Sequence, residues 1–69
     1  MTNLADFYRY ELVRRSGKYN MIMEAKAAAK AANLDLLIYC QVIRNYEQLK
    51  RVAESKYGSI DNFMGAYAG

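Results

Sequence analysis

Residues 20–44, NMIMEAKAAAKAANLDLLIYCQVIR, decide the fold that this chain is predicted to adopt. Six of the twelve residues from Met21 to Ala32 are alanine, the residue with the highest helix propensity, so this segment is predicted to be a closely packed helix. Asn33 is suited to a left-handed cap at the end of that helix, and Asp35 is suited to the N-cap of the next one. The stretch therefore predicts two helices joined by a short turn.

The helix that follows Asp35 is predicted to run from Leu36 to about Lys56. Its first half is apolar on nearly every side, whereas its second half has a narrow apolar stripe opposite charged residues. This change is typical of a helix that is buried at its start and emerges into solvent at its end. Gly58 is predicted to end it.

Two further segments with helical spacing flank this core. Asn3 is a suitable cap for a first helix, which Gly17 is predicted to end. Ser59 is a suitable cap for a last, short segment. The apolar residues of that segment recur at i, i+3, i+4 and i+7, as Ile60, Phe63, Met64 and Tyr67. Residues 65–69 are predicted to fray.

The sequence has no alternating strand pattern and no hairpin dipeptide, so it predicts an all-α protein. We expect a small three-helix bundle with a helix-turn-helix-like hairpin at its core, residues 1–58, followed by a short C-terminal helical segment, residues 59–69. A chain of 69 residues holds only one small core. The side chains predicted to fill it are Phe7, Leu12, Met21, Met23, Leu37, Ile43 and Tyr46.

The composition disfavours several classes of function. The chain has no histidine and one cysteine, so it can form no internal disulfide, and neither a zinc site nor histidine-based acid–base catalysis is expected. Cys40 lies in an apolar stretch with no base to activate it, which predicts a buried and unreactive thiol. We therefore expect no enzyme, no metal and no cofactor.

The net charge of +3 lies in the first half of the chain. Residues 1–30 have six basic and three acidic side chains, whereas residues 31–69 have four of each. Such an excess is typical either of a solvated surface or of one that meets an acidic partner. A small core also cannot bury all 7 tyrosines, so several rings are expected at an interface or at the rim of the core. The predicted protein-binding patch is basic and aromatic, and it consists of Tyr8, Arg9, Arg14, Arg15, Lys18 and Tyr19.

The central hairpin also permits a helix-turn-helix interpretation. Ala29 occupies the position of the small residue, Asn33 the turn, and Leu34 the apolar turn position. The side chains available to contact nucleic acid are Lys26, Lys30, Gln41 and Arg44. However, the second helix begins with apolar residues, whereas proteins that recognise bases have polar side chains there.

The apolar start of the third helix needs a cover. Either a second copy of the chain in a homodimer or the C-terminal segment can supply it. The residues predicted for this dimer or tail packing are Leu36, Leu37, Cys40, Ile60, Phe63 and Met64.

The stretch from Glu11 to Leu49 contains Ser16-Gly17-x-x-Asn20-Met21, then Asn33-Leu34-Asp35, then an aromatic residue at Tyr46. In this pattern the chain resembles small uncharacterised all-helical proteins of tailed bacteriophages, which often have glycine-leucine-serine in place of the Asn-Leu-Asp turn. The resemblance implies no activity. Proteins of this kind often act by binding a host or phage protein.

The expected function is that of a small protein-binding module, encoded by a phage, that binds and modulates or inhibits a host protein. The first alternative is a nucleic-acid-binding regulator of helix-turn-helix type, and the second is a small structural or assembly protein of a virion. The chain starts without a secretory signal and has no membrane-spanning run, so no membrane contact is expected. A lone thiol is typical of a protein in the reducing cytoplasm.

Overall fold

The computed structural model describes residues 3–68, and every regular element within this range is a helix. The five helices are α1 (Leu4–Ser16), α2 (Ala25–Ala31), α3 (Leu36–Arg44), α4 (Tyr46–Tyr57) and α5 (Ile60–Ala68). Together they measure 31 × 22 × 16 Å. The predicted all-α class is confirmed, with five helices where the sequence predicted three and a terminal segment.

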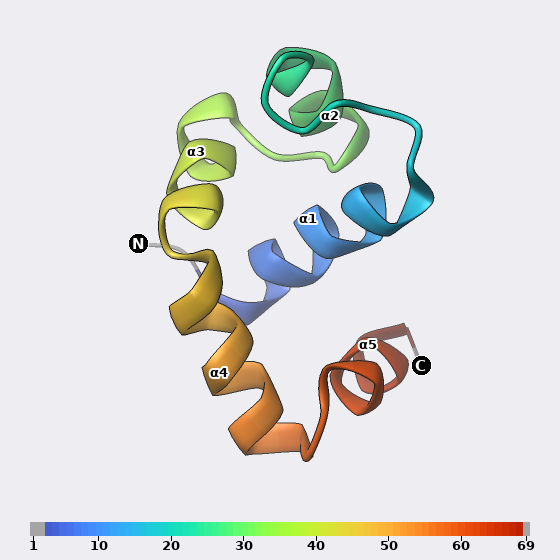
Figure 1. Ribbon diagram of the computed structural model, residues 1–69, viewed down its shortest axis with the longest axis vertical. Coiled ribbons are helices and arrows are strands. Elements are labelled where there is room, and N and C mark those ends of the chain that lie inside the picture. The colour runs from blue at the N-terminus through green and yellow to red at the C-terminus, as the bar shows by residue number, and fades with distance from the viewer. Residues whose placement is uncertain (1–2, 69) are drawn as a thin grey trace.

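Helix α1 lies at the centre of the fold and packs against all four other helices (Figure 1). Helices α3 and α4 follow one another as a bent column along one side of the molecule. Helix α2 packs against α1 and α3 at one end, and α5 packs against α1 and α4 at the other. The two ends therefore share α1 and the bent column, while α2 and α5 do not contact each other.

The helices begin and end largely where local signals predict, because those residues satisfy the terminal backbone groups. The side chains of Asn3, Asp35 and Ser59 accept backbone amide hydrogen bonds of 2.9, 3.0 and 3.0 Å at the starts of α1, α3 and α5. Gly17 and Gly58 follow α1 and α4 with φ angles of 70° and 92°, which glycine adopts without steric strain. These predicted caps are confirmed.

The turn between α2 and α3 is a Schellman motif. Asn33 has a φ of 57°, in the left-handed region that was predicted for it. Its amide donates to the Lys30 carbonyl at 3.0 Å, and the Leu34 amide donates to the Ala29 carbonyl at 2.9 Å. These two bonds satisfy carbonyls that the end of α2 would otherwise leave unpaired. The helical hairpin therefore has a well-defined turn.

The single helix predicted from Leu36 to Lys56 is wrong, because the chain bends at Asn45 between α3 and α4. The Asn45 side-chain amide donates to the Gln41 carbonyl at 2.9 Å, and the Asn45 backbone amide donates to the same carbonyl at 3.0 Å. A side chain that bonds to the carbonyl four residues back competes with the helix and bends it. The bend allows both helices to pack against α1.

The helix predicted from Met21 begins at Ala25, and residues 21–24 form a turn instead. The Tyr39 hydroxyl donates to the Met21 carbonyl at 2.6 Å. Because this bond holds the Met21 carbonyl against α3, the regular helix starts one turn later. The hydrogen bond also ties the turn before α2 to the start of α3.

The core lies where α1 meets the bent column and α5. Its largest fully buried side chains are Phe7, Glu11, Tyr39, Val42 and Phe63. Aromatic rings pack in tilted pairs through it, with centroids 5.5 Å apart for Phe7 and Phe63 and 5.4 Å apart for Tyr10 and Tyr39. Such pairs stabilise the core beyond the apolar area that they bury.

Helix α5 belongs to this core. Phe63 and Met64 are buried, and the Tyr67 ring packs on Phe63 with 4.9 Å between centroids. The segment 65–69, predicted to fray, is helical as far as Ala68, where the described residues end. Since α5 contacts only α1 and α4, the alternative in which it covers the start of α3 is wrong.

The predicted core is confirmed in part. Phe7 is fully buried, and Met21, Ile43 and Tyr46 pack against the core with part of their surface exposed. The wrong positions, with their exposed fractions, are Leu12 (47%), Met23 (85%) and Leu37 (66%). Leu12 is exposed because α1 turns its Glu11 face inward, and Leu37 is exposed because α3 buries Tyr39 and Val42 instead. No helix within residues 3–68 has the length and apolar character needed to cross a bilayer.

Candidate functional site

Glu11 is a charged side chain buried on the inner face of α1, where it is 1% exposed. Its carboxylate accepts hydrogen bonds of 2.8 and 2.6 Å from Nε and Nη2 of Arg14 and of 3.2 Å from Nε of Arg15. The Tyr46 hydroxyl donates a fourth, at 3.0 Å, and the Arg14 guanidinium lies 5.6 Å from the centroid of the Tyr46 ring. Bidentate pairing and aromatic contact together compensate the burial of this charge.

Two opposing effects act on the pKa of Glu11. Burial raises it, but the hydrogen bonds from Arg14, Tyr46 and Arg15 outweigh burial and hold the pKa below its ordinary value. Burial, together with the nearby Glu11 carboxylate, raises the pKa of Tyr46 to about 12. Glu11 is therefore ionised at neutral pH with both oxygens engaged, which suits a role in stability rather than in proton transfer.

The three arginines of the predicted protein-binding patch each pair with a carboxylate of this chain. The pairs are Arg9–Asp6 (3.3 Å), Arg14–Glu11 (2.6 Å) and Arg15–Asp61 (3.3 Å). Arg15 also lies 3.2 Å from Glu11. The charges of these arginines are thus compensated within the fold.

The two tyrosines of that patch pack into the fold. Tyr8 lies against Phe63 and Tyr67 of α5, with centroids 6.3 and 5.5 Å apart, and Tyr19 is half-buried against the core. Lys18 is exposed. Four of the six predicted residues are therefore exposed, while the two tyrosines, like most tyrosines of the described residues, are rings at the rim of the core.

The residues predicted to contact nucleic acid divide between two places. Lys26 and Lys30 of α2 line an open groove of about 510 Å³ between α2 and α3. Arg44 lines a second groove, over the joint between α3 and α4. Gln41 is half-buried, and its side-chain oxygen is enclosed without a hydrogen-bond partner among residues 3–68. The four side chains do not line a common groove.

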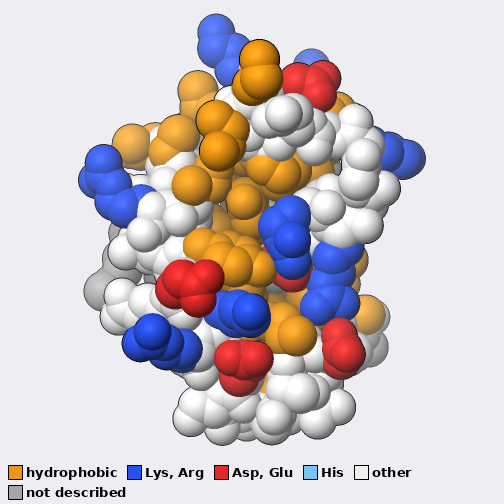
Figure 2. Space-filling view, in the orientation of Figure 1, with side chains coloured by type: hydrophobic (Ala, Val, Ile, Leu, Met, Phe, Trp, Pro, Cys, Tyr) orange, Lys and Arg blue, Asp and Glu red, His pale blue; other side chains and the backbone are white. Residues whose placement is uncertain are grey.

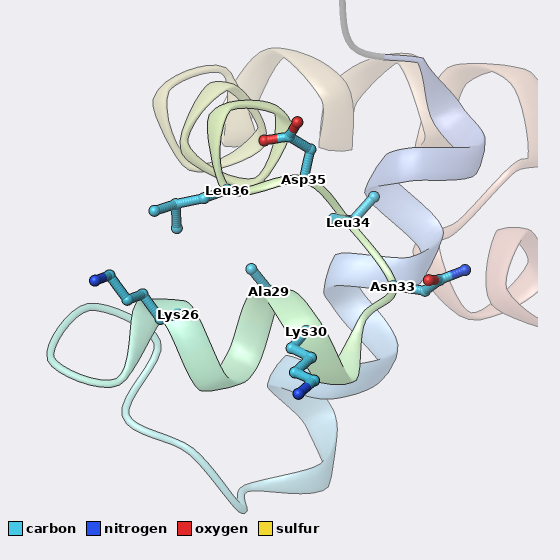
Figure 3. A pocket seen from close by; sticks show the side chains of 7 residues that line it. All are labelled: Lys26, Ala29, Lys30, Asn33, Leu34, Asp35 and Leu36. Carbon is cyan, nitrogen blue, oxygen red and sulfur yellow. The ribbon is translucent and has the colours of Figure 1, made fainter.

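The groove between α2 and α3 is apolar across its middle (Figure 3). Ala29 from α2 and Leu36 from α3 lie on its opposite sides, and Leu34 lies in the turn that closes one end. Lys26 stands at the other end, and Asp35 adds a carboxylate beside the start of α3. The groove thus combines an apolar middle with charged edges.

The most exposed large apolar side chains of the described residues are two neighbours in the turn before α2. Ile22 is 78% exposed and Met23 is 85% exposed, and we call this pair the apolar knob. Core filling was predicted for Met23, and its exposure shows that this prediction is wrong. Residues 21–24 form a turn outside α2, so helical spacing does not place these two side chains.

Hydrogen bonds hold the turn that carries the apolar knob. Oδ1 of Asn20 accepts from the amides of Ile22 and Met23 at 3.1 and 2.9 Å. Oε1 of Glu24 accepts from the Asn20 amide at 2.8 Å, and the Met21 carbonyl is bound by α3. The turn therefore satisfies these backbone groups internally while its two apolar side chains face solvent.

Three of the residues predicted for dimer or tail packing are exposed on α3. Leu36 is 39% and Leu37 66% exposed. The prediction of a buried Cys40 thiol is wrong, because α3 turns Tyr39 and Val42 inward and leaves Cys40 exposed. Figure 2 shows apolar side chains gathered over the end of the molecule where α2 and α3 lie. The other three residues predicted for this packing belong to α5 and pack against the core: Ile60, Phe63 and Met64.

Among residues 3–68, no group of three or more histidine, cysteine or acidic side chains is placed to hold a metal ion. Comparisons with models of protein families, with curated proteins and with solved structures find no match to this chain. Function is therefore inferred from the surface itself.

Proposed function

We propose that this chain is a small, non-enzymatic protein-binding module that engages its partner with the end formed by α2, the turn before it and the start of α3. The observation that carries the proposal is the apolar knob, whose two side chains are 78% and 85% exposed on a hydrogen-bonded turn. Leu36 and Leu37 add exposed apolar surface at the start of α3. Clustered apolar side chains that are held in water by a rigid backbone are typical of protein-binding surfaces.

We further propose that the partner is a host protein, which the chain modulates or inhibits by occupying part of its surface. The resemblance of residues 11–49 to small phage proteins supports this class of partner. A preformed turn also supports it, since a binding surface that is already ordered loses little conformational entropy when it meets its partner.

Nucleic-acid binding is the second candidate, because α2 and α3 pack as a hairpin with helix-turn-helix features. Ala29 is buried, Asn33 is left-handed, and Lys26 is exposed on α2. The exposed residues at the start of α3 favour the first candidate, however. Leu37 and Cys40 stand where proteins that recognise bases have polar side chains.

The test compares three forms of the chain as baits in a bacterial lysate. They are the natural chain, the double variant Ile22→Ser/Met23→Ser, and the control Leu12→Ser/Val52→Ser. The control removes two apolar side chains, each 47% exposed, from other faces of the molecule. We expect a protein that the natural chain and the control retain and the knob variant loses, with no effect of nuclease.

Two results would contradict the proposal. Equal retention by all three baits would show that the knob does not bind the retained protein. Loss of the retained material on nuclease treatment would favour the nucleic-acid candidate, and substitution of Lys26 and Arg44 should then abolish binding.

A further inference from the structure

We infer that the apolar knob inserts into an apolar recess, rimmed by carboxylates, on a folded protein. This inference rests on the proposed function and adds the chemistry of the partner's site. Ile22 and Met23 are adjacent in one turn and both are highly exposed, so a surface that encloses both is concave and wide enough for two side chains. Because Asn20 and the Met21 carbonyl are bonded within the chain, insertion leaves few backbone groups without partners.

Exposed lysines precede and follow the turn that carries the knob. Lys18, Lys26 and Lys30 are exposed and form no ion pair within residues 3–68, whereas the three arginines of α1 are each paired with a carboxylate. Lys26 follows this turn, residues 21–24, by two residues, and Lys18 precedes it by three. Glu24 is the one acidic residue between Lys18 and Lys30, and its side chain binds the amide at the start of the turn. Carboxylates around the recess would complement this arrangement.

A recess in a protein suits the knob better than a lipid surface does. A single myristoyl chain gives only marginal binding to membranes, and Ile22 and Met23 together have fewer carbon atoms than that chain. In a recess both side chains are enclosed on several sides, and partner carboxylates can meet the lysines at short range.

A recess on a partner protein is also a better binding surface for the knob than a second copy of this chain is. In a twofold dimer the same surface meets itself, so the lysines of one copy would face those of the other. Like charges across an interface are unfavourable.

Affinity measurements with the purified partner from the lysate test this inference. The first variant is Lys18→Gln/Lys26→Gln/Lys30→Gln, and its matched control, which removes three charges from α4, is Lys50→Gln/Arg51→Gln/Lys56→Gln. We expect the first to lower affinity by roughly 10-fold at low salt and the control by less than about two-fold. Replacing Ile22 or Met23 by serine should lower affinity by roughly 10- to 100-fold each. Circular dichroism verifies that each variant remains folded.

A carbodiimide, which couples amines to carboxylates in direct contact, supplies a second measurement. We expect it to join Lys18, Lys26 or Lys30 to aspartate or glutamate side chains of the partner. Suppose that binding of the partner requires the knob, but that the two charge-removing variants lower affinity equally or the couplings occur only on α4. Either result would overturn the inferred acidic rim of the recess and leave the proposed function standing. If no protein depends on the knob, both are overturned.

Two further assays test whether the knob binds a lipid surface or a second copy of the chain instead. Cosedimentation of the natural chain with phosphatidylserine vesicles, lost in Ile22→Ser/Met23→Ser, would assign the knob to a lipid surface and overturn the inference. A dimer mass in light scattering that the same variant reduces to a monomer would assign it to a second copy. We expect neither result.

Discussion

Replacing Arg14 by alanine is expected to destabilise the fold strongly, although Arg14 lies at the surface. Its guanidinium contacts both oxygens of Glu11, at 2.8 and 2.6 Å, and Glu11 is 1% exposed. The variant leaves a buried carboxylate with Arg15 and Tyr46 as its partners. Breaking a buried ion pair costs about 3–5 kcal/mol. Because the Arg14 side chain is 44% exposed and two partners remain, we expect a loss of about 2–3 kcal/mol.

Urea unfolding at neutral pH, followed by circular dichroism, measures this change in the free energy of unfolding. A domain of this size has a total stability of about 3–10 kcal/mol, so the loss is large. The matched control is Arg9→Ala, which removes another α1 arginine from an i,i+3 pair with Asp6. We expect the control to lose less than about 1 kcal/mol, because that pair is exposed. Equal losses would refute the reasoning that the burial of Glu11 sets the energy of its pair with Arg14.

The Glu11 carboxylate also determines how the free energy of unfolding changes at low pH. Burial raises the pKa of Glu11, but its hydrogen bonds lower this pKa by more than burial raises it. The pKa in the folded state therefore lies below the pKa in the unfolded state. Such a group contributes stability above its unfolded pKa of about 4.3, and the contribution is lost as the pH falls through the folded pKa. The natural chain should therefore lose stability below about pH 4.5, and Glu11→Gln should lose less over that range. Identical acid profiles for the two would contradict this assignment.

Three other predictions concern exposure, the core and charge. Cys40 should react with a thiol reagent in the folded protein as fast as in urea, and strong protection in the native state would contradict its exposed position. Phe63→Ala should cost about 3–5 kcal/mol and Leu12→Ala less than about 1 kcal/mol in urea unfolding, and similar losses would mean that α1 buries a different face. DNA binding should be weak and absent at ~200 mM salt, whereas sequence-specific binding that survives this salt would favour the nucleic-acid candidate.

The ends of most helices could be predicted because their causes are local. Asn3, Asp35 and Ser59 bind amides two or three residues away, and Asn33 and Gly58 need only their own backbone conformation. Interactions over this distance leave a signature in the sequence itself. The all-helical class follows from the same signals.

The features that could not be predicted depend on residues far apart in the chain. The buried face of α1 includes Glu11 because Tyr46, 35 positions later, donates to it. The start of α2 moves because Tyr39 binds the Met21 carbonyl, 18 positions earlier. The polar face of a helix can be turned inward when distant partners compensate it, so apolar periodicity alone misplaced Leu12.

For the candidate site, the sequence indicated one part and missed another. The apolar start of the third helix was predicted to need a cover, and Leu36 and Leu37 are exposed there. The knob was missed because methionine and isoleucine beside an alanine-rich helix resemble core residues. The turn at residues 21–24, whose Met21 carbonyl is bound by Tyr39 from 18 positions away, replaces the helix that was predicted there.

Under the proposed function, the partner binds at the α2 end of the molecule, opposite the α5 end. At the α5 end, large rings such as Phe7 and Phe63 are fully buried, and Glu11 draws Arg14 and Arg15 into ion pairs. At the α2 end, the buried side chains of the helix are alanines, which bury little apolar area per residue and contribute correspondingly little stability. An arginine paired with a carboxylate acts at a distance as a dipole, whereas an unpaired lysine keeps its full charge. The pairs that stabilise α1 therefore also leave the long-range positive field of the first half of the chain to Lys18, Lys26 and Lys30. The α2 end also carries the most exposed large apolar side chains of the described residues, and under the proposed function it is the surface that the partner covers.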